Sequence, residues 1–164
     1  MNDKIKTVCS YLDNLGINYK KIEHSPAATM EECKKIEEIL DNAICKNLLL
    51  RTTNGSAYYL LILRNDKQFV TSRISKLLGS SRLSFASGEE MENLLNTSPG
   101  SLRILSLIFD KEKKIKLAVD RDAVENEFFC CHPCDNTATL KIKASDITDI
   151  FIPSLEIKPV IIEA

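Results

Sequence analysis

Short runs of apolar, β-branched or aromatic residues recur along this chain of 164 residues, with helix and turn signals between them. Most runs are about four to eight residues long, which is the usual length of a strand. We expect strands at 45–50, 58–63, 102–109, 115–119, 128–131 and 139–143, and shorter ones at 19–22 and 159–162. The chain should therefore fold around a sheet.

Helix signals lie between these runs. An apolar stripe that stops at Gly16 predicts a first helix over about 3–15. Thr29 and Ser87 are each followed three residues later by a glutamate, which is the pattern of a capping box. A shorter helix is expected over 72–78, and Ser145 is expected to cap a last helix through 147–151.

The turns decide how the strands are paired. Asn54-Gly55 between two apolar runs is a strong hairpin signal, and 110–114 is expected to be a looser turn between another antiparallel pair. Hairpins mixed with helices predict the α/β class, of the α+β type. We expect one domain over residues 1–164 with a mixed, largely antiparallel central sheet flanked by helices.

Composition narrows the functional classes. Hydrophobic residues make up 44% and charged residues 27%, and no apolar run approaches the roughly 20 residues of a membrane span. The charged N-terminal pattern is unlike a signal peptide, so we expect a soluble, cytoplasmic protein without a membrane partner. A net charge of -1 also argues against extensive binding to duplex DNA.

The segment 130–139 concentrates reactive groups, because it reads Cys-Cys-His-Pro-Cys-Asp-Asn-Thr-Ala-Thr. Cys131 and Cys134 have the spacing of a zinc knuckle, but a second pair of ligands is missing. A redox Cys-x-x-Cys would precede a helix, whereas Asp135-Asn136 is typical of a turn before a β-prone run. We therefore expect the thiols to accompany a ligand pocket rather than to hold a metal or form a disulfide.

Lys46 is the other conspicuous residue, since it lies at the start of a run that otherwise heads into the core. A buried lysine loses hydration unless it faces a cleft, although the solvent face of an edge strand would also accommodate it. Asn47 should project to the opposite face. The remaining cysteines at 9, 33 and 45 occupy apolar positions and are expected in the core.

Taken together, these residues resemble the YbaK/ProX family, the free-standing relatives of the editing domain inserted in bacterial prolyl-tRNA synthetases. The resemblance covers almost the whole chain. Its motifs are Glu23-His24-Ser25-Pro26 with Thr29, the run 46–51, Leu77-Leu78-Gly79, 82–87, Ser98-Pro99-Gly100-Ser101, His132-Pro133 and 135–139. Any one of them is weak, but together and in this order they are specific.

The resemblance implies a fold like that editing domain and hydrolysis of mischarged aminoacyl-tRNA, most characteristically alanine on proline tRNA, without a metal or organic cofactor. Its partners would be the tRNA acceptor end and prolyl-tRNA synthetase. Lys46, Gly100 and Ser101 would be catalytic: a lysine charge at the phosphate or ester carbonyl, and a glycine N–H at the oxyanion. Thr29, Asn47, His132 and Asn136 would bind substrate. The neighbouring ribose hydroxyl would assist in place of a protein base.

One departure concerns the loop after Gly100. Ile104 stands where the family has the proline of Gly-x-x-x-Pro, so the edge of the amino-acid pocket should differ. The alternative function is a non-catalytic module that binds an amino acid or an aminoacyl-tRNA and has a degraded catalytic loop.

Overall fold

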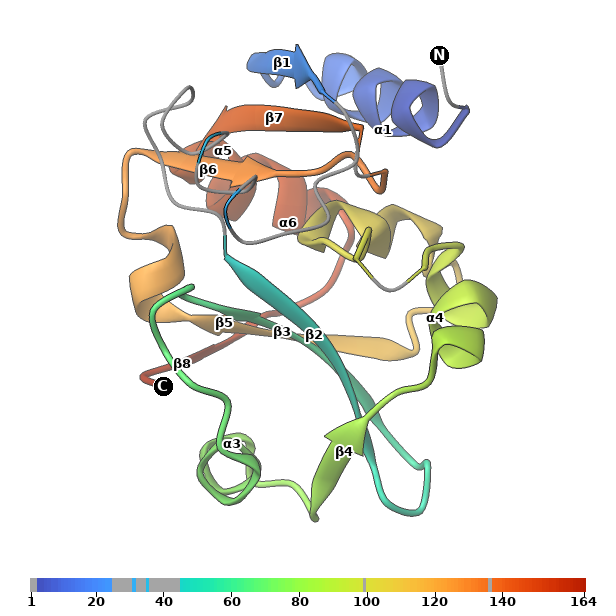
Figure 1. The fold of residues 1–164 in the computed structure, drawn as a ribbon, viewed down its shortest axis with the longest axis vertical. Coiled ribbons are helices and arrows are strands. Elements are labelled where there is room, and N and C mark those ends of the chain that lie inside the picture. Colours follow the sequence, from blue (N-terminus) through green and yellow to red (C-terminus); the bar gives the residue numbers. More distant parts are fainter. Residues whose placement is uncertain (1–2, 25–30, 32–34, 36–44, 99, 136) are drawn as a thin grey trace.

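The computed structural model describes residues 3–24, 31, 35, 45–98, 100–135 and 137–164. One of its two sheets has three strands, which lie side by side in the upper part of Figure 1. Their order is β1 (Tyr19–Glu23), β7 (Ala138–Lys143), β6 (Phe128–Cys131), and each neighbouring pair is antiparallel. Strands β6 and β7 therefore form a hairpin closed by the turn that contains His132 and Cys134.

The second sheet has five strands and is mixed. Its order is β4 (Leu83–Phe85), β2 (Lys46–Thr52), β3 (Tyr58–Leu63), β5 (Ile115–Asp120), β8 (Val160–Ile162). The pairs β4–β2 and β2–β3 are antiparallel, whereas β3–β5 and β5–β8 are parallel. The expected hairpin at Asn54-Gly55 and the short edge strand near the C-terminus are both confirmed.

Helices and single turns connect the strands. They are α1 (Asp3–Asn14), α3 (Thr71–Leu78), α4 (Gly88–Leu95), η1 (Ile104–Phe109), η2 (Arg121–Val124), α5 (Ala144–Asp146), the π-helical η3 (Ile147–Phe151) and α6 (Ile152–Ser154). Helix α1 buries Ile5, Val8, Cys9 and Leu12 at helical spacing, as its stripe predicted. The capping box of Ser87 and Glu90 at the start of α4 is also confirmed.

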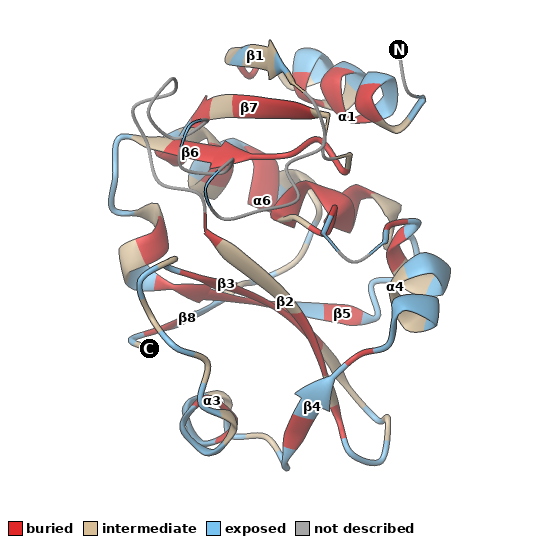
Figure 2. Ribbon diagram, viewed as in Figure 1, coloured by how far each residue is buried: buried red, intermediate tan, exposed pale blue. Residues whose placement is uncertain are grey.

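Strand β2 lies between two apolar clusters, and its buried residues lie in its second half (Figure 2). Leu49 points into the larger cluster, which also holds Leu140 and Ile142 of the three-stranded sheet. Leu50 belongs to the smaller cluster with Ile74 of α3. Because successive side chains of a strand alternate, Lys46 shares the face of Leu50 and Asn47 shares the face of Leu49.

The α/β class with a mixed, largely antiparallel strand arrangement is confirmed, with the strands divided between two sheets. The prediction of a strand at 102–109 is wrong, because Ile104–Phe109 forms the 3-10 helix η1. Five consecutive side chains of η1, from Ile104 to Ile108, are buried. A continuous apolar run fits a buried helix as well as a buried strand, and here the Ser106 hydroxyl accepts the Arg103 N–H and starts the helical turn.

Two further expectations, for the turn at 110–114 and for the cap of the last helix, are also wrong. The turn at 110–114 joins η1 to β5 rather than two antiparallel strands. Ser145 does not cap the last helical segment, because the helix begins one residue earlier at Ala144, and Lys143 is the N-cap residue. Instead, the Ala144 N–H donates a hydrogen bond of 2.9 Å to the carbonyl of Glu127, the residue just before β6. This bond fixes the start of the helix.

The helix that Thr29 was expected to open, with Cys33 on its inner face, lies outside the described residues. Within the described ranges, none of the helices has the length and apolar character needed to cross a bilayer.

Candidate functional site

Lys46 is the first residue of β2, at the end of the strand next to Leu63 of β3. Its side chain is half-buried, and its Nζ donates a hydrogen bond to the Lys67 carbonyl oxygen at 2.5 Å. An ammonium carries three donors, so this contact orients the group and leaves further donors for another acceptor. The strand end therefore presents a positioned positive charge.

The segment that holds Lys46 is itself fixed by a buried carboxylate. Asp120, at the end of β5, is fully buried and accepts from the Lys67 Nζ at 2.9 Å and from the Arg64 N–H at 3.2 Å. Lys67 also donates to Asp122 at 2.7 Å. The hydrogen bond to Asp122 is the main reason that the pKa of Lys67 is raised, and Lys67 in turn lowers the pKa of Asp122.

Asn47 projects to the other face of β2, toward the larger core. Its Nδ2 donates to the Cys45 carbonyl at 3.0 Å, which fixes the orientation of the amide. Its Oδ1 is buried and has no hydrogen-bond partner among the described residues. An unsatisfied buried acceptor costs about 1–3 kcal/mol, so a donor from a ligand would be favourable there.

His132 follows β6 and is buried in a small polar cluster. Its Nδ1 lies 2.7 Å from the Ala138 carbonyl oxygen, and since a carbonyl only accepts, Nδ1 carries the proton. The Thr139 hydroxyl is 3.3 Å from the same nitrogen and 2.8 Å from Nε2 of His24. The two imidazole centroids are 5.8 Å apart. In the neutral ring the Nε2 of His132 is therefore an acceptor.

Burial keeps this imidazole neutral. Desolvation is the largest cause that lowers the pKa of His132 to about 4, and the positive charge of Arg103 acts in the same direction. His132 thus enters a reaction at neutral pH as an uncharged hydrogen-bonding group rather than as a cation.

Gly100 and Ser101 lie in the loop between α4 and η1. The Gly100 φ of 91° is in the region that favours glycine, whereas a Cβ there would have no described atom within 4 Å. Within the protein, the reason for a glycine at this position is therefore its backbone conformation. The Ser101 N–H donates to the Ser98 carbonyl at 3.0 Å, and Ser101 is buried.

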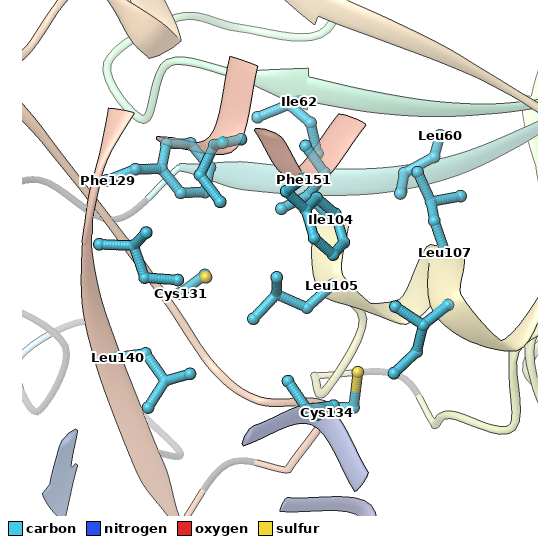
Figure 3. Close-up of a cluster of buried hydrophobic side chains, with 14 of the residues drawn as sticks. Leu60, Ile62, Ile104, Leu105, Leu107, Phe129, Cys131, Cys134, Leu140 and Phe151 are labelled. Atoms are coloured by element: carbon cyan, nitrogen blue, oxygen red, sulfur yellow. The ribbon is translucent and has the colours of Figure 1, made fainter. Parts of the chain in front are cut away.

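Arg103 follows this loop, and its positive charge is one of the causes that lower the pKa of His132. The next residue, Ile104, is completely buried in the larger core, and Figure 3 shows it among the core side chains. The residue that stands in place of the expected proline therefore packs inside the protein.

The cysteines of segment 130–139 are core residues. Figure 3 shows Cys131 and Cys134 among apolar side chains, and both are 1% exposed. Burial raises the pKa of Cys134 to about 11 and that of Cys131 well above the usual value, so both are thiols at neutral pH. The described residues include no group of three His, Cys, Asp or Glu side chains that could hold a metal ion.

The proposed site residues fall on both sheets. Lys46 and Asn47 belong to the five-stranded sheet and His132 to the hairpin of the three-stranded sheet, and no hydrogen bond between described residues joins Lys46 to His132. Thr29 and Asn136 lie outside the described residues. The structure adds His24 and Thr139, of which Thr139 contacts His132 and is bonded to His24. It also adds Asp120, which binds Lys67, the residue whose carbonyl accepts from Lys46. The sequence marked His24 by its place in the 23–26 motif and Thr139 by its place in the 135–139 motif. No sequence motif marked Asp120.

Comparison with known proteins identifies the domain type. A family model described as "Aminoacyl-tRNA editing domain" matches residues 24–150. The prolyl-tRNA editing protein ProX of Acetoanaerobium sticklandii is 32% identical over 90% of this chain and 90% of its own length. Prolyl-tRNA synthetase associated domain-containing protein 1 of Danio rerio is 27% identical over 98% of this chain and 87% of its own length.

The fold is also found among solved structures. The crystal structure of a candidate trans-editing enzyme for prolyl tRNA synthetase superposes with a TM-score of 0.74, covering 100% of this chain and 99% of that one. The two sequences are only 14% identical, so this likeness concerns the fold alone.

Proposed function

Because the chain belongs to the aminoacyl-tRNA editing domain family, we propose that its reaction is the hydrolysis of alanine wrongly attached to proline tRNA. Membership of the family makes it an aminoacyl-tRNA deacylase, an ester hydrolase, as the sequence resemblance implied. The observation that carries the proposal is the family match over 24–150, a range that includes Lys46, Gly100 and His132. The identity of the amino acid and of the tRNA, and a mechanism without a cofactor, are part of the proposal.

Hydrolysis of an aminoacyl ester needs a charge that stabilises the oxyanion, a held amino group and a positioned water. Lys46 suits the first need, because its ammonium is oriented by the Lys67 carbonyl and keeps donors for a phosphate or for the ester carbonyl. In a partly desolvated cleft such a charge interacts more strongly than it would in water.

The loop at Gly100 would supply a second donor to the oxyanion. Since the Ser101 N–H is already bonded to Ser98, the available candidates in our proposal are the Gly100 N–H and the Ser101 hydroxyl. Proton transfer would then rest on the neighbouring ribose hydroxyl of the tRNA, because burial lowers the pKa of His132 to about 4 and makes it a weak base at neutral pH.

Recognition of the amino acid would use acceptors on both sheets. The buried Oδ1 of Asn47 and the Nε2 of His132 can each accept a hydrogen bond from the substrate amine or ribose. Asn136 and Thr29 complete this set in our proposal. The pocket would admit alanine and exclude proline by shape.

We also propose that the protein acts in the cytoplasm, where charged tRNAs are used, and that prolyl-tRNA synthetase supplies the mischarged substrate. The name of the ProX relative makes proline tRNA the substrate to test first.

A panel of purified aminoacyl-tRNAs tests the function. We expect release of free alanine from proline tRNA that carries alanine, and no release of proline from proline tRNA that carries proline. Lys46→Ala protein, shown to be folded, is the matched control for contaminating hydrolases. Retention of the ester on every mischarged tRNA, with tRNA binding intact, would instead establish the non-catalytic binding module.

A further inference from the structure

Three lysines share one face of the three-stranded sheet, which Figure 1 shows at the top of the molecule. Lys20 of β1 is directly opposite Lys141 of β7, and Lys143 follows two residues later on the same face. We call Lys20, Lys141 and Lys143 the basic strip. The intervening residue Ile142 points the other way, into the core.

The arrangement of the basic strip is unfavourable for the protein alone. Like charges directly opposite each other on neighbouring strands destabilise a sheet. Among the residues that the structure describes, none of the three ammonium groups is within ion-pair distance of a carboxylate. By contrast, Lys113 pairs with Glu156 at 2.7 Å and Lys114 with Glu112 at 2.8 Å.

The strip borders an open, shallow depression. An open groove of about 500 Å³ is lined by the three lysines together with Tyr19, Phe128 and Asp146. Phe128 lies opposite Lys143, and the Lys141 Nζ is 4.3 Å from the centroid of its ring. Asp146 is the one carboxylate among these lining residues, so the groove as a whole is positive.

The groove is connected to the candidate site by strand β7. Thr139, which contacts both His24 and His132, lies on the same strand face as the strip, because it is two residues before Lys141. At about 3.4 Å per residue, Lys141 is roughly 7 Å and Lys143 roughly 14 Å along the strand from Thr139. A substrate that places its end near His132 could therefore extend along this face.

We propose that the basic strip docks the phosphate backbone of the tRNA while its aminoacylated end occupies the site. This inference rests on the proposed function, because that function brings a polyanion to the neighbouring His132 cluster. Two lysines along one strand and a third on its neighbour, beside an aromatic ring, suit a repeating phosphate backbone, since each ammonium can neutralise one phosphate. A nucleic acid explains both the repeated positive charge and its position beside the site, whereas an acidic protein segment would explain only the charge.

Salt dependence of tRNA binding tests the proposal. The triple variant Lys20→Gln, Lys141→Gln and Lys143→Gln removes the three charges and keeps most of the side-chain length. The matched control is Lys111→Gln, Lys113→Gln and Lys116→Gln, which makes the same change of net charge in and before β5 of the other sheet. Kd for uncharged proline tRNA is measured from about 50 to about 200 mM KCl, with circular dichroism to confirm folding.

If the strip makes three phosphate contacts, the affinity of the control should fall about 20- to 40-fold more over this salt range than that of the strip variant, the lower value for single-stranded and the higher for duplex phosphates. Equal salt dependence in the two variants would overturn the proposal and identify the strip as a solvated surface. Stronger binding of an acidic peptide than of tRNA by the unmodified protein would overturn it as well.

A short substrate separates this inference from the proposed function. The alanyl ester of adenosine reaches the site but not the strip, so the strip variant should hydrolyse it at the rate of the unmodified protein while its kcat/KM on alanyl-tRNA falls. If the unmodified protein hydrolyses neither the alanyl ester of adenosine nor alanyl-tRNA, the proposed function is refuted. Hydrolysis of both esters with equal kcat/KM in the strip and control variants would refute the docking surface only.

Discussion

The surroundings of Lys46 and of His132 are held in place by different physical means. At the end of β2, the ammonium of Lys46 is oriented through a carbonyl whose segment is fixed by the ion pair of Lys67 with buried Asp120. At the β6–β7 hairpin, His132 is held by neutral hydrogen bonds to Ala138 and Thr139, and burial keeps it uncharged. One side of the candidate site is ionic and the other is neutral.

This difference suits a reaction in which charge develops at one place only. A fixed cation stabilises an oxyanion, whereas a neutral acceptor can hold an amine without repelling it. The two regions should therefore respond differently to substitution and to pH, and the predictions below use that contrast.

The largest effect is expected from the cation itself. Lys46→Ala should lower kcat for deacylation by at least about a hundredfold, because removing one charge-stabilising donor typically costs 10²–10³ in rate. The measurement is single-turnover release of alanine from alanyl-tRNA. A folded Lys46→Ala protein with unchanged rate would remove the ionic region from the catalytic site.

Of the two carboxylates that pair with Lys67 below Lys46, the buried one should contribute more to stability. Asp120→Ala should destabilise the fold by about 3–5 kcal/mol, since it leaves the Arg64 and Lys67 donors without their buried carboxylate. Asp122→Ala removes the more exposed partner of Lys67 and should cost much less stability than Asp120→Ala, because water screens that pair. Urea unfolding of both variants measures the difference, and equal losses would contradict a special role for Asp120.

The neutral region should respond to pH. The unfolded imidazole has a pKa near 6.5 and the folded one a pKa of about 4, so between these values only the unfolded chain binds the proton. Stability from this group is complete above about pH 6.5 and is lost as the pH falls toward 4, by about 3 kcal/mol in all.

The comparison that isolates this effect is His132→Asn against the unmodified protein, each unfolded in urea at several pH values. Carboxylates titrate in both proteins, so only the difference between the two curves reports on His132. Parallel curves would show that His132 does not contribute to the acid sensitivity of the fold.

A smaller effect is expected at the residue that joins the two imidazoles. Thr139→Val preserves shape but removes the hydroxyl shared by His24 and His132, at a cost of about 1–2 kcal/mol. If the hydroxyl positions His132 for substrate, KM for alanyl-tRNA should rise while kcat changes little. A purely structural role would lower stability and leave KM unaltered.

The smallest effect on activity is expected at the thiols. Cys131→Ser should leave deacylation unchanged, because the sulfur is packed in the core rather than at the site. Its only consequence should be a loss of about 1–3 kcal/mol from burying a hydroxyl. A loss of rate under conditions where the variant is folded would reopen cysteine chemistry.

Local signals predicted much of the fold. The box of Ser87 and Glu90 satisfies backbone donors within four residues, and Asn54-Gly55 closes a hairpin between adjacent strands, so neither depends on distant parts of the chain. The run 102–109 was assigned wrongly because its hydrophobicity fits burial in either a helix or a strand. Its conformation depends on the core that surrounds Ile104 and Leu105.

The candidate site shows the same division. Lys46 and His132 were singled out from residue type and order, since a lysine in an apolar run and a His-Pro before a turn are visible in one dimension, whereas the Gly100 loop came from the family resemblance. Asp120, which holds the segment under Lys46, lies 53 residues from its partner Lys67, and no local pattern marks it.

The sequence by itself determined the family, the α/β class and the residue types available for chemistry, because motif order, periodicity and capping are properties of neighbouring residues. Only the tertiary structure decided which groups are charged, which are neutral and which lie in the core. Burial and partners set those properties, and both are supplied by strands that meet from distant parts of the chain. The cysteines are the clearest case, since packing among apolar side chains turned conspicuous reactive groups into ordinary core residues.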